Sequence, residues 1–172
     1  MKNNQVLLSP NEYEKLTEEL DYLTNERRRE VAERIRHARG FGDLSENAEY
    51  DAAKDEQAAL EAKIAKKKDM LKRAKVILPE DVDLDRVNVG SKVKIRDLDH
   101  DEEFSYTIVG AAYADPARNR ISYRSPVGEA LYGKTVGEEV DVNLPAGVVT
   151  YRIEDIKWVG GTTEDLEEAN EG

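Results

Sequence analysis

Two carboxylates, Asp43 and Glu46, stand three residues apart just after the glycines Gly40 and Gly42. This spacing at a helix start is also typical of a capping box, in which side chains bind backbone N–H groups. A capping carboxylate can keep one oxygen free, and carboxylate oxygens are ligands for Mg²⁺. Two carboxylates alone make a poor Mg²⁺ site. We therefore expect them to act beside a metal held by another protein, where they would fix a second ion and orient an attacking water.

Three further residues around this turn have two interpretations each. Arg39 and Lys54 flank the turn on either side, and they either contact nucleic-acid phosphates or remain solvated or paired within their helices. Phe41 is apolar at an exposed turn, and it either packs back under Leu44 or touches a partner.

The first helix that leads to this turn has a clear start. Ser9 can cap it, Pro10 suits the first helical position, and Glu12 completes a capping box. A glycine pair at residues 40 and 42 predicts its end. Apolar residues follow at spacings of three and four, with a break at Arg27, which predicts a coiled-coil stripe. The stripe consists of Tyr13, Leu16, Leu20, Leu23, Val31, Ile35 and Ala38.

A second helix is predicted from residues 43–45 to about Val76, before Pro79. Its stripe also alternates by four and three, with two polar positions. Each helix has about 30 residues and spans roughly 45 Å. The short glycine-containing turn favours an antiparallel hairpin within one chain over an ordinary dimerising coiled coil. The second stripe consists of Ala53, Gln57, Leu60, Ile64, Lys67, Leu71, Ala74 and Leu78.

The second part of the chain has the alternating pattern of strands. We expect about five strands and a short helix at 129–133, entered through Ser125 and Pro126. The fold class is therefore α+β, with a hairpin domain at 1–78 and a β-rich domain at 79–160. An acidic tail at 161–172 is expected to be disordered. The predicted strands are 92–96, 104–108, 121–123, 140–144 and 149–156.

Composition excludes several function classes. The 172 residues contain no Cys and two His, which argues against thiolate chemistry and His-based metal sites. Apolar runs are far shorter than the roughly 20 residues of a membrane helix, and no signal peptide is recognisable, so we expect a cytoplasmic protein. Residues 1–78 carry 16 charges of each sign, whereas residues 79–172 carry 10 basic and 21 acidic ones. This balance argues against strong binding to free nucleic acid.

Two separated motifs resemble the Gre family of bacterial transcript cleavage factors, in particular its GreA type. The first is Gly42–Tyr50 (GDLSENAEY) followed by Ala52–Gln57, and the second runs from Ile121 to Lys134. The resemblance extends from Leu8 to about Val159. It implies an antiparallel coiled coil followed by an FKBP-like domain, in a protein that is not itself an enzyme. The implied partners are RNA polymerase and the RNA 3′ end of a backtracked complex, and we expect a monomer.

The resemblance also implies roles for six residues. Asp43 and Glu46 would be the acidic pair that holds the second Mg²⁺ in the polymerase active site. Arg39 and Lys54 would contact the extruded RNA, although the family often has Arg where Lys54 stands. Ser125 and Pro126 would contact the polymerase at the rim of its secondary channel. Phe41 stands where some members have a charged residue or His, so its role stays open.

Two other functions remain as alternatives at this point. One is a family member that occupies the same channel and inhibits the polymerase. The other is a structural coiled-coil adaptor that uses the acidic pair only for capping.

Overall fold

The computed structural model describes residues 4–40, 48–162 and 164. The chain forms two compact units. One is a helical unit, Glu14–Arg73, and the other is a β-rich unit that combines Met1–Tyr13 with Ala74–Gly172. The fold class is α+β, as predicted. The unit boundaries differ from a simple division at residue 78, because short segments on both sides of the helices belong to the β-rich unit.

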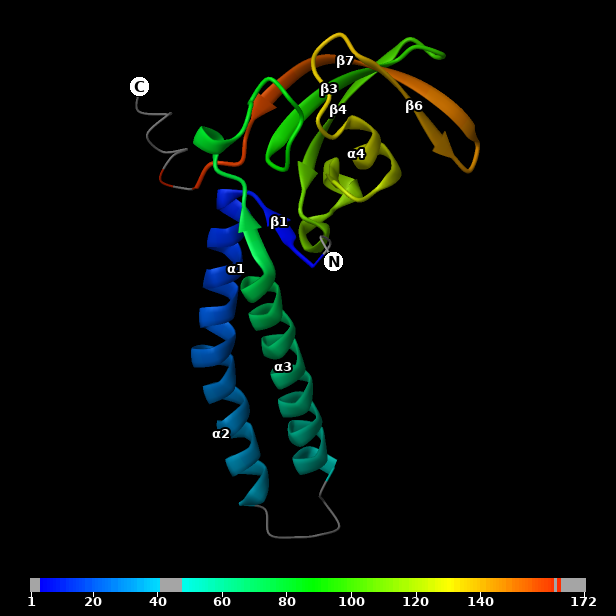
Figure 1. Cartoon of the computed structure of the whole chain (residues 1–172). Helices are drawn as coiled ribbons and strands as arrows, with labels where there is room; N and C mark the ends of the chain where they lie inside the picture. Colours follow the sequence, from blue (N-terminus) through cyan, green and yellow to red (C-terminus); the bar gives the residue numbers. More distant parts are fainter. Residues whose placement is uncertain (1–3, 41–47, 163, 165–172) are drawn as a thin grey trace. The chain divides into compact units, whose positions relative to one another are not determined.

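The helical unit is an antiparallel hairpin (Figure 1). Helix α1 (Pro10–Tyr22) continues through a π-helical turn, η1 (Leu23–Arg27), into α2 (Arg28–Arg39), and α3 (Ala48–Arg73) returns beside them. The predicted stripes form its core, in which six residues are buried: Leu23, Val31, Ile35, Ala53, Leu60 and Ile64. The hairpin is therefore confirmed, and α3 ends three residues earlier than expected. The predicted start of this helix, at 43–45, lies outside the described residues.

The π-helical turn explains the break in the first stripe. Leu23 and Val31 are 7% and 1% exposed, although they stand eight residues apart, one more than a heptad. In a regular α-helix the extra residue would rotate Val31 by about 100° away from the seam. A π turn accommodates one additional residue within a single turn. The apolar face therefore continues from Leu23 to Val31 without a change of side.

Ion pairs join the two arms of the hairpin along its length. Lys67 lies 2.7 Å from Glu19, and Arg27 lies 2.7 Å from Glu56. Arg28 donates two hydrogen bonds, of 2.9 and 2.8 Å, to Glu61. Each pair joins a residue of the first arm to one of α3, so together they favour one register of the two arms.

The first turn of α1 belongs to the β-rich unit and contains the predicted capping box. The Ser9 N–H donates to Glu12 Oε1 at 3.0 Å, and the Gly110 N–H donates to both Glu12 oxygens at 3.1 and 3.0 Å. Burial raises the pKa of Glu12, while these backbone donors oppose the rise. Glu12 and Leu16, one turn apart, occupy the buried side here, so Tyr13 is 39% exposed instead of joining the stripe.

A small parallel sheet flanks the hairpin sequence. Strand β1 (Val6–Leu8) pairs with β2 (Ala74–Val76), a segment predicted as helix. The prediction was wrong because the 3.5-residue pattern of α3 continues into Ala74 and does not reveal the pairing with β1. Pairing satisfies the backbone of these residues and joins two segments that are far apart in the sequence.

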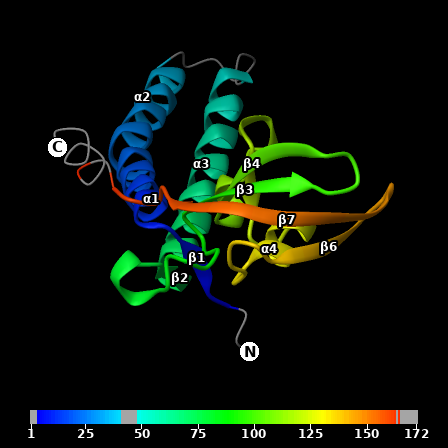
Figure 2. The ribbon, with the colours of Figure 1, turned by 90° about the horizontal axis from the view of Figure 1, so that it is seen from above.

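The β-rich unit contains a five-stranded sheet in the order β5-β4-β3-β7-β6. Its pairs are antiparallel except β4–β5. Figure 2 shows β7 between β3 and β6, with α4 (Pro126–Leu131) near β6. The predicted strands are present. Their bounds are β3 (Ser91–Asp97), β4 (Glu102–Val109), β5 (Arg120–Ser122), β6 (Glu139–Leu144) and β7 (Gly147–Trp158).

The chain remains ordered just beyond β7. Val159 N–H donates to Gly90 O at 2.8 Å, and Gly160 O accepts from Asn11 N–H at 3.0 Å. The Trp158 ring lies where side chains at Gly90 or Gly160 would be, since a Cβ there would stand 2.5 or 2.8 Å from it. The tail predicted to be disordered falls largely on residues 163 and 165–172, outside the described residues.

Candidate functional site at the end of the hairpin

The predicted acidic pair lies between the ends of two helices. Asp43, Glu46 and Phe41 are outside the described residues, which end at Gly40 and resume at Ala48. Helix α2 ends at Arg39 and α3 begins at Ala48. The motif Gly42–Tyr50 therefore spans the chain between the two helices, and most of it lies outside the described residues.

Arg39 is paired with an aromatic ring across the hairpin. Its guanidinium carbon lies 5.7 Å from the centre of the Tyr50 ring, within the range of a cation–π interaction. A hydrogen bond from Arg39 lowers the pKa of the Tyr50 hydroxyl. The end of α2 and the first turn of α3 are thus in contact on this side.

Lys54, the second predicted RNA contact, lies one turn beyond Tyr50. Its Nζ donates to Gln57 Oε1 at 3.1 Å, within the same helix. Lys54 and Arg39 are both exposed. Neither forms an ion pair with a carboxylate of residues 4–40, 48–162 or 164.

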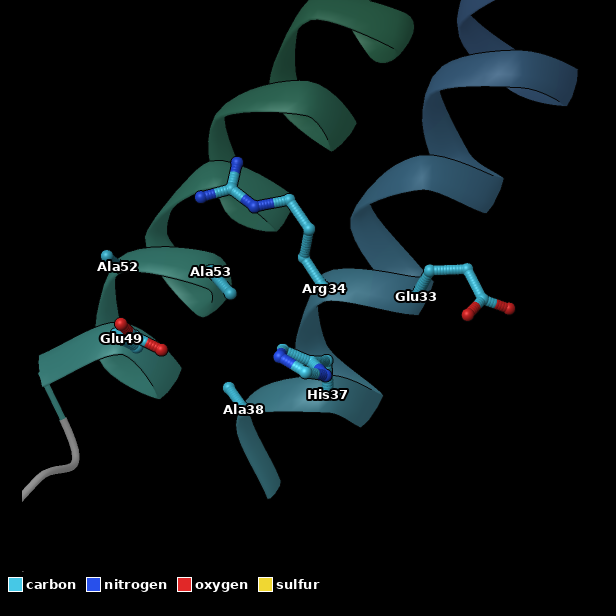
Figure 3. A pocket seen from close by; sticks show the side chains of 7 residues that line it. All are labelled: Glu33, Arg34, His37, Ala38, Glu49, Ala52 and Ala53. Atoms are coloured by element: carbon cyan, nitrogen blue, oxygen red, sulfur yellow. The ribbon is translucent and has the colours of Figure 1, made fainter. Parts of the chain in front are cut away.

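An open hollow of about 680 Å³ lies between α2 and α3 close to the same end (Figure 3). Three alanines leave the space, because their methyl groups do not fill the gap between the helices. In Figure 3, Arg34 extends toward α3, whereas Glu33 points away from it. Arg39, Tyr50 and Lys54 do not line this hollow. Its lining residues are Glu33, Arg34, His37, Ala38, Glu49, Ala52 and Ala53.

The hairpin end therefore has two chemically different sides. Tyr50 and Lys54, one turn apart on α3, face the side on which Arg39 lies, and Lys54 is close enough to lower the pKa of Tyr50 further. On the side of the hollow, Arg34 is paired with Glu56. A phosphate would therefore meet two cations that have no carboxylate partner among the described residues on the Arg39 side, and an ion-paired arginine on the hollow side.

No group of three or more carboxylate or imidazole side chains within the described residues is arranged to hold a metal ion. Asp43 and Glu46 would supply oxygen donors, which suit Mg²⁺, but a pair is short of a complete site. Their chemistry therefore fits a metal that has other ligands elsewhere.

Ser125 and Pro126, the predicted docking residues, begin α4 in the β-rich unit. The Ser125 hydroxyl donates to Ser122 O at 2.6 Å and accepts from Gly128 N at 3.1 Å, so it is fully engaged as a helix cap. Pro126 occupies the first helical position and is exposed. A Cβ at Gly128 would overlap the carbonyl oxygen of Ser122, which explains the glycine of this motif.

Tyr50 was missed as a functional residue by the reasoning from sequence. The signal was present, because Tyr50, Ala53 and Gln57 continue the spacing of three and four that defines the seam of the second helix. In the structure, Tyr50 packs against the hairpin core and contacts Arg39 at the end of α2.

Two family matches cover most of the chain. Residues 6–76 match the family described as "Transcription elongation factor, N-terminal", and residues 81–158 match "Transcription elongation factor, GreA/GreB, C-term". The chain belongs to the GreA/GreB family of transcription elongation factors. The two matches are separated by residues 77–80, which follow β2.

Relatives identify the chain as a GreA-type transcription elongation factor. "Transcription elongation factor GreA" of Caldanaerobacter subterraneus subsp. tengcongensis is 54% identical over 152 residues, which cover 88% of this chain and 97% of that protein. GreA of Acetivibrio thermocellus is 50% identical over 155 residues, covering 90% and 98%.

Among solved structures, the GreA factor homolog 1 (Gfh1) protein of Thermus thermophilus is 29% identical, with a TM-score of 0.42. The alignment covers 89% of this chain and 99% of that protein. Of the helices in the described part of this GreA-type chain, none is long and apolar enough to cross a membrane.

Proposed function

We propose that this GreA-type factor inserts its hairpin into the secondary channel of RNA polymerase and stimulates the polymerase's own cleavage of backtracked RNA. The observation that supports this most is the position of the acidic motif. In the sequence, Asp43 and Glu46 fall between the last residue of α2 and the first residue of α3, within the motif that resembles the family's tip. A narrow two-helix rod is suited to carry charged groups into a deep cavity.

The proposed chemistry divides between the two kinds of tip residue. Asp43 and Glu46 would supply carboxylate oxygens to the second Mg²⁺ of the polymerase active site, an ion that supplies an activated water when bound. Arg39 and Lys54 would hold phosphates of the extruded RNA 3′ end, Arg39 in a forked geometry and Lys54 as a point charge. The factor would not be an enzyme by itself, since the catalytic site belongs to the polymerase.

The proposal extends to the state and location of the protein. We infer that it acts as a monomer in the cytoplasm, where it meets its polymerase. Its acidic β-rich part disfavours free DNA and RNA, so recognition would depend on the protein partner and on local contacts at the tip.

A stalled, backtracked polymerase complex with end-labelled RNA tests this function. Adding the protein should shorten the RNA at least about tenfold faster than the polymerase does alone, a barrier change of about 1.4 kcal/mol. Slower elongation without cleavage would instead indicate an inhibitor. Binding to the polymerase without any effect on the RNA would indicate an adaptor. Either result would contradict the proposal.

The docking proposal is best tested at Pro126, because Ser125 is needed to cap α4. Pro126→Ala keeps a helix-compatible residue at an exposed position, so the fold should be retained. If Pro126 touches the polymerase, the dissociation constant should rise about three- to tenfold, or roughly 0.7–1.4 kcal/mol.

Pro145→Ala is a matched control, since Pro145 is also exposed and lies in the turn between β6 and β7. It should bind as the parent does. An unchanged affinity for Pro126→Ala, measured by titration of labelled factor with polymerase, would remove Pro126 from the docking surface.

A further inference from the structure

We propose that Tyr50 is a positioning residue for Arg39: it holds the Arg39 guanidinium at the end of α2, so that Arg39 meets the extruded RNA already in place. This inference rests on the proposed function and adds a residue to it. The six residues implied by the family resemblance do not include Tyr50.

Arg39 and Tyr50 stand in the sequence on either side of the segment that carries the acidic motif. Arg39 is the last residue of α2, and Tyr50 is the third residue of α3, so the two bracket the segment that carries Asp43 and Glu46. The guanidinium carbon lies 5.7 Å from the Tyr50 ring centre. The Arg39 guanidinium also lowers the pKa of the Tyr50 hydroxyl, which is consistent with their close approach. The cation–π contact therefore restricts the position of the guanidinium.

Tyr50 is anchored, whereas Arg39 is not. The Tyr50 ring packs against the hairpin core formed around Val31, Ile35 and Ala53. Arg39 is exposed, and the described part of the chain gives it no carboxylate partner. The core therefore holds the Tyr50 ring in place, and the ring in turn restricts the position of the Arg39 guanidinium.

Such order has a consequence for binding. A long, flexible arginine side chain loses rotamer freedom when it binds a phosphate, and a side chain that is already held loses less. The guanidinium retains donors that the ring does not use, because it carries five N–H groups. Tyr50 thus orders Arg39 without blocking it.

The test is a cycle of substitutions measured on the backtracked complex. Cleavage rates are recorded over a range of factor concentrations, so that the maximal rate and the half-saturating concentration are separated. Tyr50→Leu keeps an apolar side chain against the core but removes the ring and hydroxyl. It should lower the maximal rate about two- to fivefold, the size of an exposed cation–π contact, and leave the half-saturating concentration unchanged.

The double variant separates positioning from general destabilisation. Tyr50→Leu should have no further effect in an Arg39→Gln background, because the group that it positions is gone. Tyr50→Phe should restore most of the rate, since the ring remains. Tyr22→Leu, the same change at a half-exposed tyrosine of α1, should match the parent.

A measurement on the free protein gives an independent readout. In a pH titration followed by NMR of ¹³C-labelled tyrosines, Tyr50 should ionise at a higher pH in Arg39→Gln than in the parent. Equal ionisation in both proteins, or slowing by Tyr50→Leu that persists in Arg39→Gln, would overturn the inference. Failure of the parent itself to stimulate cleavage would overturn the proposed function instead.

Discussion

Replacing both acidic tip residues by their amides, Asp43→Asn with Glu46→Gln, should abolish cleavage stimulation without weakening polymerase binding. Asn and Gln keep the size of the parent side chains, and both remain good capping residues. The substitutions therefore preserve a capping box and remove only the negative charge that Mg²⁺ requires. We expect the maximal cleavage rate to fall about 10²- to 10³-fold, the usual effect of removing a group that stabilises a transition state electrostatically.

A matched control lies in the first turn of α3. Glu49→Gln with Asp51→Asn makes the same chemical changes at acidic residues just outside the acidic pair. This control should stimulate cleavage as the parent does. The readout is labelled RNA in a backtracked complex, with polymerase affinity measured in parallel. Parental cleavage by Asp43→Asn/Glu46→Gln would leave the acidic pair with capping alone and refute its role at the metal.

The largest expected effect on stability belongs to Gly128→Ala. A Cβ at this position overlaps the Ser122 carbonyl oxygen, a backbone atom that cannot move without displacing β5. It also approaches the Ser125 hydroxyl, which caps α4. We expect the free energy of unfolding of the β-rich unit to fall by about 3 kcal/mol, at the upper end for overpacking.

The single tryptophan makes this measurement specific. Trp158 belongs to the β-rich unit, so its fluorescence during urea unfolding reports that unit. Gly137→Ala is the control: Gly137 has a φ of +91° but open space around its Cβ. It should cost only about 1–2 kcal/mol, from backbone strain. Equal losses for the two variants would show that the close approach of α4 to β5 does not matter.

The regular part of the fold was predictable because it depends on local patterns. The spacing of Leu16, Leu23 and Ile35 defines a helix, and alternation at Val93 and Ile95 defines a strand. Pairing between distant segments was not predictable in this way. Nothing in residues 6–8 indicates that they pair with 74–76, because a three-residue strand is too short to show a period.

In the candidate site, too, features that depend on local sequence were predictable, whereas contacts between distant residues were not. Asp43 and Glu46 could be proposed from residue type and spacing, and their position between the helices followed from the predicted turn. The contact between Arg39 and Tyr50 required knowledge of how the arms face one another. The double role of Glu12, which binds Gly110 as well as its own cap, depends on a partner 98 residues away. A carboxylate in a capping motif gives no sign of that.

The π-helical turn at Leu23–Arg27 has a consequence for how such a protein can change over generations. One residue inserted in the middle of a long α-helix would normally rotate the rest of that helix by about 100° about its axis, so that a different face would meet the partner helix. Here the π-helical turn accommodates the additional residue, and α2 keeps the same face toward α3. The register of α2 against α3 therefore depends on keeping this turn π-helical: removing one of its residues would need a return to a regular α-helical turn to preserve the same contacts.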